Sequence, residues 1–376
     1  MLKPLSSPLL LTLLALLGGG LVQVYSSSYI FATESFGDGL YFFERQLLFS
    51  GIAFVALLVA AHVPIRWIEK WGWMMWMIAG IGVILTFVPG LGVRAGGAAR
   101  WIQLPLGLRI EPSEALKFSF SLLFASFLTK DQNFLGRLRW WAVIPLIAVP
   151  LGLLLRQPDF GSFAIIICVA VALLLAFGLR WSYLIASFAV ILPAFYLLVM
   201  RVPYRRARVL AFLDPWADPE QKGFQVIQSM LSFHSGGITG SGLGQGQGKL
   251  FFLPEAHTDF TLAVFGEEMG FIGFCLLLGL YGFVVLRGFQ IALKTENLFR
   301  KALALGISMT FALGVFINAG VVMGLLPTKG LTLPFFSYGG SSLITLCFMF
   351  GLLLNIEKNL CEETQSPFFP RRSRLD

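Results

Sequence analysis

Long apolar runs, separated by shorter polar connections, cover most of the chain. Ten of them suit membrane helices, at approximately residues 8–27, 47–64, 72–90, 113–129, 141–156, 161–178, 182–201, 260–286, 301–325 and 338–356. A helix needs about 20 predominantly apolar residues to cross a bilayer, so the shorter runs fix their ends only loosely. The pattern predicts an all-α polytopic integral membrane protein with about ten transmembrane helices. We expect them to form a single membrane domain over residues 1–376.

The distribution of Lys and Arg predicts how these helices are oriented. With the N-terminus in the cytoplasm, the inner segments carry fifteen of these residues and the short outer loops carry six. That asymmetry follows the positive-inside rule. An even number of helices then places both termini in the cytoplasm, including the tail 357–376.

The connection 202–259, between the seventh and eighth predicted helices, is the longest polar segment and falls on the outer side. Loops of this length inside a compact domain are usually functional or disordered. It contains the apolar patches 209–213 and 224–233 and the glycine-rich run GGITGSGLGQGQGK. We expect amphipathic helices at the membrane interface, followed by a flexible glycine-rich segment.

The composition agrees with a membrane protein but says little about what the protein does. Hydrophobic residues make up 57% of the chain and charged residues 13%, with a mean hydropathy of +0.79, whereas soluble domains average about 25% charged residues. The net charge of +8 is explained by topology and anionic lipid, so it does not indicate nucleic acid. The four cysteines show no paired spacing, which argues against a disulfide framework or a metal site.

The stretch KLFFLPEAHTDF at 249–260 gathers polar groups at the edge of an apolar run. Glu255, His257, Thr258 and Asp259 lie within five positions, and a carboxylate at the rim of a membrane helix is costly. Asp259 suits two roles, the N-cap of the following helix or a general base whose pKa partial burial would raise. His257 lacks a second histidine at metal-ligand spacing.

Glu267 and Glu268 follow about two turns into the same apolar run. In a helix that begins at Asp259, Glu268 points to nearly the opposite side, so the two carboxylates cannot easily share one reacting centre. We predict that Glu268 forms a buried polar link to another helix, because charges inside membranes are usually paired.

Cations are the second notable group on the outer side. In EPSEALK, Glu114 and Lys117 lie three residues apart on one helical face. They could form a local salt bridge, or Lys117 could be a positioned cation at the outer edge of a cavity. Arg100, in GAARWIQL, could bind a phosphate. A further basic group at the end of the seventh run suggests an anionic ligand such as a pyrophosphate; its members are Arg201, Arg205, Arg206 and Arg208.

The segment 324–342, GLLPTKGLTLPFFSYGGSS, interrupts two apolar runs with two prolines and four glycines. Such irregular backbone is tolerated at membrane depth only where it lines a cavity. We expect a re-entrant, cavity-lining segment with Lys329 as its one charge; the alternative is an ordinary external loop. One carboxylate and several cations around an outward-facing cavity suit an amphiphilic, anionic substrate whose tail stays in the bilayer.

Several of these segments resemble, in order, the signatures of the SEDS family of bacterial cell-wall proteins. They are GAARWIQL, EPSEALK, RQPDFGS, GFQVIQS, LPEAHTDF, GEEMGFIG and LPTKGLTLPFFSYGGSS. Within the family, VYSSS, DPW, LPEAHTDF and PTKGLTLP are more similar to the division type, FtsW, than to the elongation type, RodA. The family usually has Gln where this chain has Glu111.

The resemblance implies a peptidoglycan glycosyltransferase of the inner (cytoplasmic) membrane that polymerises lipid II at the division septum. Its partners would be a class B penicillin-binding protein transpeptidase and other divisome membrane proteins. Asp259 matches the family's essential aspartate, the general base. We assign substrate binding or the shaping of the cavity to Arg100, Glu114, Lys117, Arg205, Glu255, His257, Thr258, Lys329 and Ser337.

The sequence is compatible with a metal ion and with three rival functions. A divalent cation could bridge the pyrophosphate, but the sequence shows no ligand set for one and implies no other cofactor. The rival functions are a lipid II flippase, which needs no base, a non-catalytic scaffold that activates its transpeptidase, and a RodA-type role in elongation.

Overall fold

The computed structural model describes residues 7–365, apart from 96–97, 104–108, 131–139, 184, 187–188, 190–192, 194–195, 202–205, 207–211, 220–222, 251–252 and 329. The helices of four or more turns are α1 (Pro8–Phe36), α2 (Tyr41–His62), α3 (Ile65–Leu85), α4 (Pro112–Lys130), α5 (Trp140–Arg156), α6 (Phe160–Ala176), α10 (Thr261–Lys294), α11 (Leu298–Val322) and α12 (Gly340–Gln365). Shorter elements are the π-helix η3 (Tyr196–Met200), the 3-10 helix η4 (Pro215–Ala217) and α9 (Phe224–Gly236).

These helices confirm a mostly helical, multi-pass membrane protein. Within the described residues, α1, α2, α3, α10, α11 and α12 are long and apolar enough to cross a membrane. The remaining predicted helices α4, α5 and α6 have 19, 17 and 17 residues. Nine of the ten predicted runs therefore correspond to helices in the described part of the chain. The seventh, 182–201, is described only in part, and the π-helix η3 lies within it.

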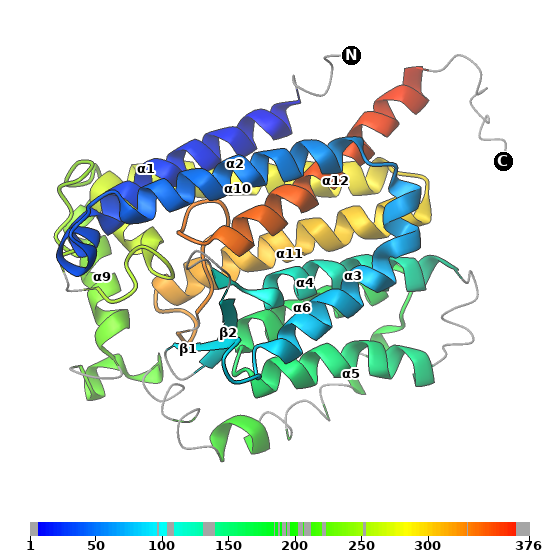
Figure 1. Ribbon diagram of the computed structural model, residues 1–376, viewed down its shortest axis with the longest axis horizontal. Helices are drawn as coiled ribbons and strands as arrows, with labels where there is room; N and C mark the ends of the chain where they lie inside the picture. Colours follow the sequence, from blue (N-terminus) through cyan, green and yellow to red (C-terminus); the bar gives the residue numbers. More distant parts are fainter. Residues whose placement is uncertain are drawn as a thin grey trace.

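Helix α4 lies at the centre of the bundle, where α3, α6, α11 and α12 all contact it (Figure 1). Its apolar residues Leu116, Phe120 and Phe124 are fully buried. Neighbouring helices therefore shield its four serines and its charged residues Glu114 and Lys117 from lipid. A central position explains how so polar a helix is accommodated within a membrane protein.

The start of α1 and the end of α12 lie at the same end of the bundle (Figure 1). Ser7, just before α1, donates a hydrogen bond of 2.7 Å to the carboxylate of Glu357 in α12. The same carboxylate accepts from Arg287 of α10 at 2.6 Å. This arrangement agrees with an even number of membrane crossings.

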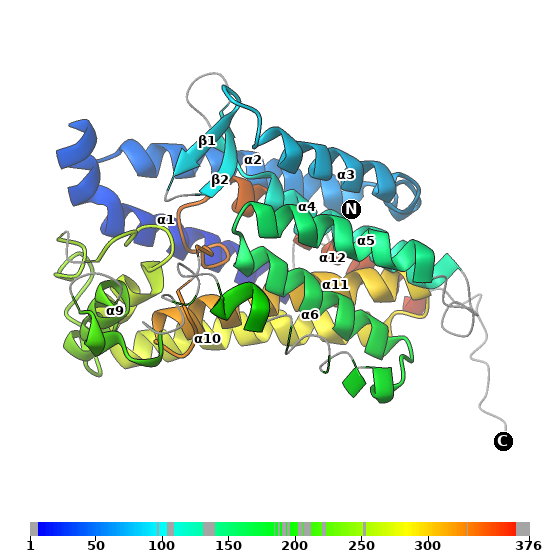
Figure 2. The same ribbon diagram turned by 90° about the horizontal axis from the view of Figure 1, so that it is seen from below.

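A small antiparallel sheet follows α3, and the all-α prediction missed it. Its strands β1 (Gly92–Ala95), β2 (Ala98–Gln103) and β3 (Arg109–Ile110) pair in the order β1-β2-β3. The sheet lies beside the bundle, with β2 against α3 and α4 (Figure 2). The residues between the paired Ala95 and Ala98 are two glycines in the sequence, which is a common signal of a two-residue hairpin.

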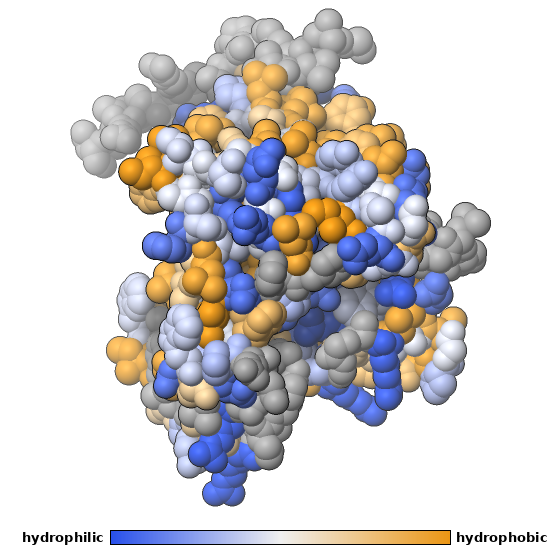
Figure 3. All heavy atoms as spheres, turned by 90° about the vertical axis from the view of Figure 1, so that its left-hand side faces the viewer, coloured by the Kyte–Doolittle hydropathy of each residue, from blue (hydrophilic) through white to orange (hydrophobic). Residues whose placement is uncertain are grey.

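The loop 202–259 is described mainly in its second half, so the apolar patch 209–213 lies largely outside the described residues. The patch 224–233 lies in α9, so a helix is present there as predicted, and α9 packs on α10 and α11. Its place at the membrane interface stays a prediction. The following glycine-rich segment was expected to be flexible, but its backbone hydrogen-bonds to α10. The surface of this end of the molecule mixes hydrophilic and hydrophobic residues (Figure 3). Ile238 and Leu243 of the loop are exposed apolar residues.

Helix α10 is interrupted at Gly270, whose φ of 65° and ψ of −169° are accessible to glycine alone. A Cβ at this position would lie 2.3 Å from the backbone nitrogen of Gly240. We expect Gly270→Ala to destabilise the protein by about 1–3 kcal/mol through backbone strain, and further through this clash. Thermal unfolding in detergent measures the effect.

The control for this prediction is Gly279→Ala in the same helix, where a Cβ meets no described atom within 4 Å. That change should be neutral or slightly stabilising, because alanine favours helix more than glycine does. Equal unfolding temperatures for the two variants would show that the break at Gly270 is not required by the fold.

Candidate active site

Asp259 lies at the end of the LPEAHTDF loop, immediately before α10. The buried side chains of Leu253, Ala256 and Phe260 anchor this loop, each less than 7% exposed. Phe260 is the N-cap residue, the helix begins at Thr261, and no side chain among the described residues caps it by a hydrogen bond. The capping role considered for Asp259 is therefore not what the structure shows, and no side chain in the described part of the chain hydrogen-bonds to its carboxylate.

Asn318 of α11 fixes the backbone at Asp259. Its amide nitrogen donates to the carbonyl oxygen of Asp259 at 2.9 Å and to that of Leu331 at 2.6 Å. It thereby joins the LPEAHTDF loop to the segment 324–342. The sequence interpretation missed Asn318, although one asparagine inside the apolar run 301–325 was a usable signal.

Arg100 of β2 lies close to Asp259, with Gly330 between them. A Cβ on Gly330 would be 2.8 Å from Arg100 Nη1 and 3.4 Å from Asp259 Oδ2, so a larger residue would crowd the guanidinium and contact the carboxylate. The guanidinium donates to the carbonyl of Pro158 at 2.9 Å and weakly to that of Gly330 at 3.5 Å. Its Nε is buried and has no partner among the described residues. Arg100 is thus held in place with a donor to spare.

The surroundings of Asp259 raise its pKa from 3.8 to about 7. Burial is the main cause, and the negative charge of Glu255 adds to it; Arg100 acts in the opposite direction and Asp159 in the same one. The residue itself is half-buried and keeps some access to solvent. A carboxylate with a pKa near the working pH is well matched to general base catalysis.

His257 is held by aromatic rings rather than aimed at a reacting group. Its ring lies 5.4 Å from that of Phe31 and 4.5 Å from that of Phe42, measured between centroids. Its carbonyl oxygen accepts a hydrogen bond of 2.9 Å from the backbone of Tyr338. Burial lowers the pKa of His257 although Glu255 raises it, so the imidazole is neutral at pH 7 and serves to dock the loop.

Glu255 and Thr258 shape the loop from within. The hydroxyl of Thr258 donates to the Glu255 carboxylate at 2.9 Å, and the Glu255 carbonyl accepts from the backbone nitrogen of Thr258 at 3.1 Å. Glu255 has a positive φ of 56°, which closes this turn. The negative charge of Glu255 affects the site by helping to raise the pKa of Asp259.

Glu114 and Lys117 form the predicted ion pair, with 2.8 Å between the Lys117 nitrogen and the Glu114 carboxylate. Both side chains are about nine-tenths buried. The pair lines a cavity of about 30 Å³ between α4, α11, α12 and the segment 331–334, which is room for a water molecule. The hydroxyl-bearing residues of that lining are Thr310, Thr332, Ser342 and Thr345. The salt bridge and the cavity edge, offered as alternatives, are both present.

Glu111, where the resemblance predicts a glutamine, lies just before α4. Burial raises its pKa from 4.5 to about 8, and the charges of Glu114 and Asp159 add to this, while Lys117 and Arg100 lower it. Its carboxylate accepts from the hydroxyl of Ser113 at 3.2 Å. A protonated carboxyl is uncharged, as an amide is, so Glu111 preserves the charge that a glutamine would give at neutral pH.

Asp159 and Arg100 interact electrostatically with both acidic residues of raised pKa, Asp259 and Glu111. The charges of both residues act on the pKa of Asp259 and on that of Glu111. Asp159 caps α6 by accepting from the backbone nitrogen of Ser162 at 3.1 Å. Asp159 belongs to the RQPDFGS segment, and its local pattern did not predict this role.

The segment 324–342 folds inward among the helices, as a cavity-lining segment is expected to do; that it is re-entrant with respect to the membrane stays a prediction. Its residues Leu331, Leu333, Phe335 and Phe336 are buried among the helices. Gly330 lies beside Asp259 and Arg100, whereas Leu331, Thr332 and Pro334 line the cavity at Glu114 and Lys117. One short segment therefore runs past both polar centres.

The remaining predicted site residues are less central. The Ser337 hydroxyl accepts from the backbone nitrogen of Leu333 at 3.0 Å, which closes a turn within its own segment. Arg205 and Lys329 lie outside the described residues, and Arg201 and Arg206 are exposed. Among the described residues no group of three or more His, Cys, Asp or Glu could hold a metal ion, so this part of the chain offers no ligand set for the divalent cation considered above.

Comparison with known proteins identifies the family. Residues 7–362 match the family model for FtsW, RodA and SpoVE, described as cell cycle protein. The chain belongs to the FtsW/RodA/SpoVE family. A family member of Geobacter metallireducens, named probable peptidoglycan glycosyltransferase FtsW, is 43% identical over 357 residues, which are 94% of each chain. Stage V sporulation protein E of Bacillus subtilis is 37% identical over 361 residues, 95% of this chain and 98% of that one.

Solved structures of the family agree with the fold. One comes from a study of the coordination of polymerization and crosslinking by a peptidoglycan synthase complex; its TM-score is 0.77 at 29% identity, covering 94% of this chain and 97% of that one. The rod shape determining protein RodA of Thermus thermophilus gives a TM-score of 0.68 at 26% identity, covering 93% and 96%. The predicted resemblance to this family, and within it to FtsW, is confirmed.

Proposed function

We propose that this protein is a peptidoglycan glycosyltransferase that polymerises lipid II during septal cell-wall synthesis, with Asp259 as its general base. The observation that carries the proposal is a half-buried carboxylate with a pKa of about 7 beside Arg100. The FtsW name of a relative 43% identical over nearly the whole chain supports the same activity.

The reaction joins two lipid-linked sugars. Asp259 accepts the proton of the acceptor hydroxyl as that oxygen attacks the anomeric carbon of the donor. The bond from that carbon to undecaprenyl pyrophosphate breaks, and the pyrophosphate leaves with the electron pair. Arg100 and Lys117 supply positive charge for the oxyanion that develops, and preorganised charge of this kind is a large source of rate enhancement.

Partners and location form the second part of the proposal. The chain works with a class B penicillin-binding protein transpeptidase and other divisome membrane proteins, in the cytoplasmic membrane at the septum, with both termini in the cytoplasm. A related structure whose study concerns polymerization and crosslinking in one complex supports a transpeptidase partner. The shared end of α1 and α12, joined by Ser7 and Glu357, supports termini on one side.

Purified protein with its transpeptidase and lipid II tests the function. Glycan polymer is expected, and its rate of formation should rise with pH through about 7 because only deprotonated Asp259 can accept a proton. Below that point the rate should fall about tenfold for each pH unit. Gel analysis of polymer across a pH series measures both.

The rival functions give different results in the same preparation. A flippase would move lipid II across a liposome bilayer without forming polymer. A scaffold would activate its transpeptidase without polymer. Either outcome, with an authentic polymerase as positive control, would rule out the proposed enzyme.

A further inference from the structure

The outer part of α10 is a separate short helix. Gly270 ends it after nine residues, 261–269, by leaving the helical conformation. Asp259 precedes its first turn directly, so the position of Asp259 depends on whatever holds this short helix. The contacts at its far end are therefore relevant to the candidate base.

The glycine-rich segment closes that far end through its backbone. The nitrogens of Ser241 and Gly242 each donate at 3.0 Å to the carbonyls of Glu267 and Glu268. Beyond the break, Phe271 donates to the Gly237 carbonyl at 2.9 Å. A Cβ on Gly240 would lie 2.2 Å from the Glu268 carbonyl, so the approach is close enough to demand glycine there.

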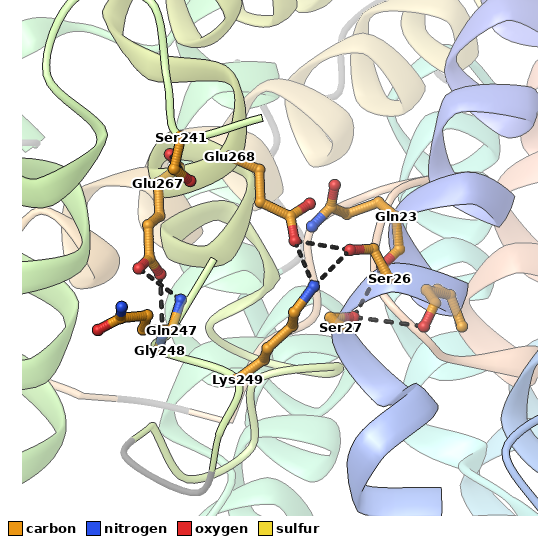
Figure 4. Close-up of polar contacts among 10 residues, drawn as sticks. Gln23, Ser26, Ser27, Ser241, Gln247, Gly248, Lys249, Glu267 and Glu268 are labelled. Carbon is orange, nitrogen blue, oxygen red and sulfur yellow. Dashed lines mark hydrogen bonds and ion pairs between the residues drawn. The ribbon is translucent and has the colours of Figure 1, made fainter. Parts of the chain in front are cut away.

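Glu267 adds a side-chain link to the same segment. Its carboxylate accepts from the backbone nitrogens of Gln247 at 2.7 Å and Gly248 at 3.0 Å (Figure 4). Hydrogen bonds to an ionised acceptor are stronger than neutral ones. The segment is thus bound to the short helix on both sides of Gly244.

A buried ion pair completes the junction. Lys249 Nζ lies 2.7 Å from the Glu268 carboxylate, and the two side chains are 5% and 0% exposed. Ser26 of α1 donates to the same carboxylate oxygen at 2.6 Å and accepts from Lys249 at 3.1 Å. Figure 4 shows the three side chains converging from α1, the loop and α10, with Gln23 beside them. This confirms the predicted link from Glu268 to another helix.

The two residues of this ion pair flank Asp259 in the sequence. Lys249 lies ten positions before Asp259, and Glu268 lies nine positions after it. Both ends of the stretch that carries Asp259 are therefore tied together and to α1. Stability alone does not account for such a pair, since apolar residues in place of a buried ion pair are often as stable or more so.

We propose that Lys249 and Glu268 are positioning residues that hold Asp259 in its reactive place through the short helix 261–269. The proposal rests on the proposed role of Asp259 as general base. Neither residue touches the reacting atoms; both act by fixing the loop and the helix on either side of the aspartate.

The double variant Lys249→Met/Glu268→Met tests this role. It removes both charges together, so no unpaired buried charge is left and the fold is retained. Loss of positioning should lower turnover on the order of 10²-fold, the effect of a displacement of about 1 Å. Asp259 should also become more exposed, so the acid limb of the pH–rate profile should move below 7. Wild-type turnover with an unchanged profile would overturn the proposal.

Hydrogen exchange gives a readout that does not need activity. Backbone amides of residues 253–260 should exchange faster in the double variant than in the wild type, and equal exchange would count against positioning. Ser26→Ala serves if the double variant does not fold. It keeps the ion pair but removes the link from this pair to α1, so it should still speed the exchange. Unchanged exchange would refute the positioning role of Lys249 and Glu268.

Two controls separate this proposal from the proposed function. Lys294→Met makes the same substitution at an exposed lysine at the other end of α10 and should leave turnover and exchange unchanged. Asp259→Asn, measured in parallel, tests the base alone. Polymer from Asp259→Asn would refute the role of Asp259 as general base. An inactive Asp259→Asn beside a fully active double variant would refute only the positioning role of Lys249 and Glu268.

Discussion

Asp259→Asn is expected to lower lipid II polymerisation by between about 10² and 10⁴-fold, the usual contribution of a general base. The amide has nearly the same shape but cannot accept the proton of the acceptor hydroxyl. Folding should not suffer, because the carbonyl of Asp259, not its carboxylate, receives the hydrogen bond of Asn318. Gel analysis of the polymer and thermal unfolding of the same preparations measure the two effects.

Glu255→Gln is the matched control, since it removes the other carboxylate of the loop by the same chemical change. It should keep polymerisation, and it should lower the pKa of Asp259 because the charge of Glu255 helps to raise it. The acid limb of its pH–rate profile should then move to lower pH. Normal polymer from Asp259→Asn would remove the aspartate from the mechanism.

Lys117→Met is expected to have the second large effect, on both stability and activity. It leaves the Glu114 carboxylate buried and uncompensated in the centre of the bundle, which costs about 3–5 kcal/mol. It also removes a cation proposed to stabilise the departing pyrophosphate. The unfolding temperature in detergent and the rate of polymerisation should both fall.

A second substitution separates these two effects. In Lys117→Met/Glu114→Gln no unpaired charge is buried, so stability should return nearly to that of the wild type. Activity should stay low, because the cation is still missing. Wild-type turnover in the double variant would show that Lys117 only neutralises Glu114. Removing Arg287, whose pair with Glu357 is 28% and 16% exposed, should cost less stability than removing Lys117.

Local pattern predicted the helices and the charged pair within one of them. The spacing of Glu114 and Lys117 predicted their ion pair, since residues three apart on a helix face one another. The link from Glu268 to another helix, seen in its hydrogen bond with Ser26 of α1, also followed from the tendency of charges inside membranes to be paired. In each case the information lies within one or two turns of a single helix.

Contacts between distant segments could not be predicted in this way. Ser26 and Lys249 meet although 223 positions separate them, and nothing in either local pattern indicates the pairing. The glycine-rich segment was expected to be flexible because its composition resembles a linker. It is ordered instead because small residues let its backbone approach the carbonyls of α10. The glycines thus indicated an irregular segment, but they did not indicate which part of the chain this segment contacts.

The central position of α4 has a consequence for how the protein enters the membrane during synthesis. An isolated segment with Glu114 and Lys117 near its start, and serines along its length, gains little from partitioning into lipid, since charged and polar residues oppose insertion of a helix by the translocon. Helix α3 precedes it in the chain and is one of its main contacts. We therefore expect the translocon to retain α4 until α3, and later α11, can cover its polar face, so that biogenesis proceeds by cooperative release of helices rather than one at a time.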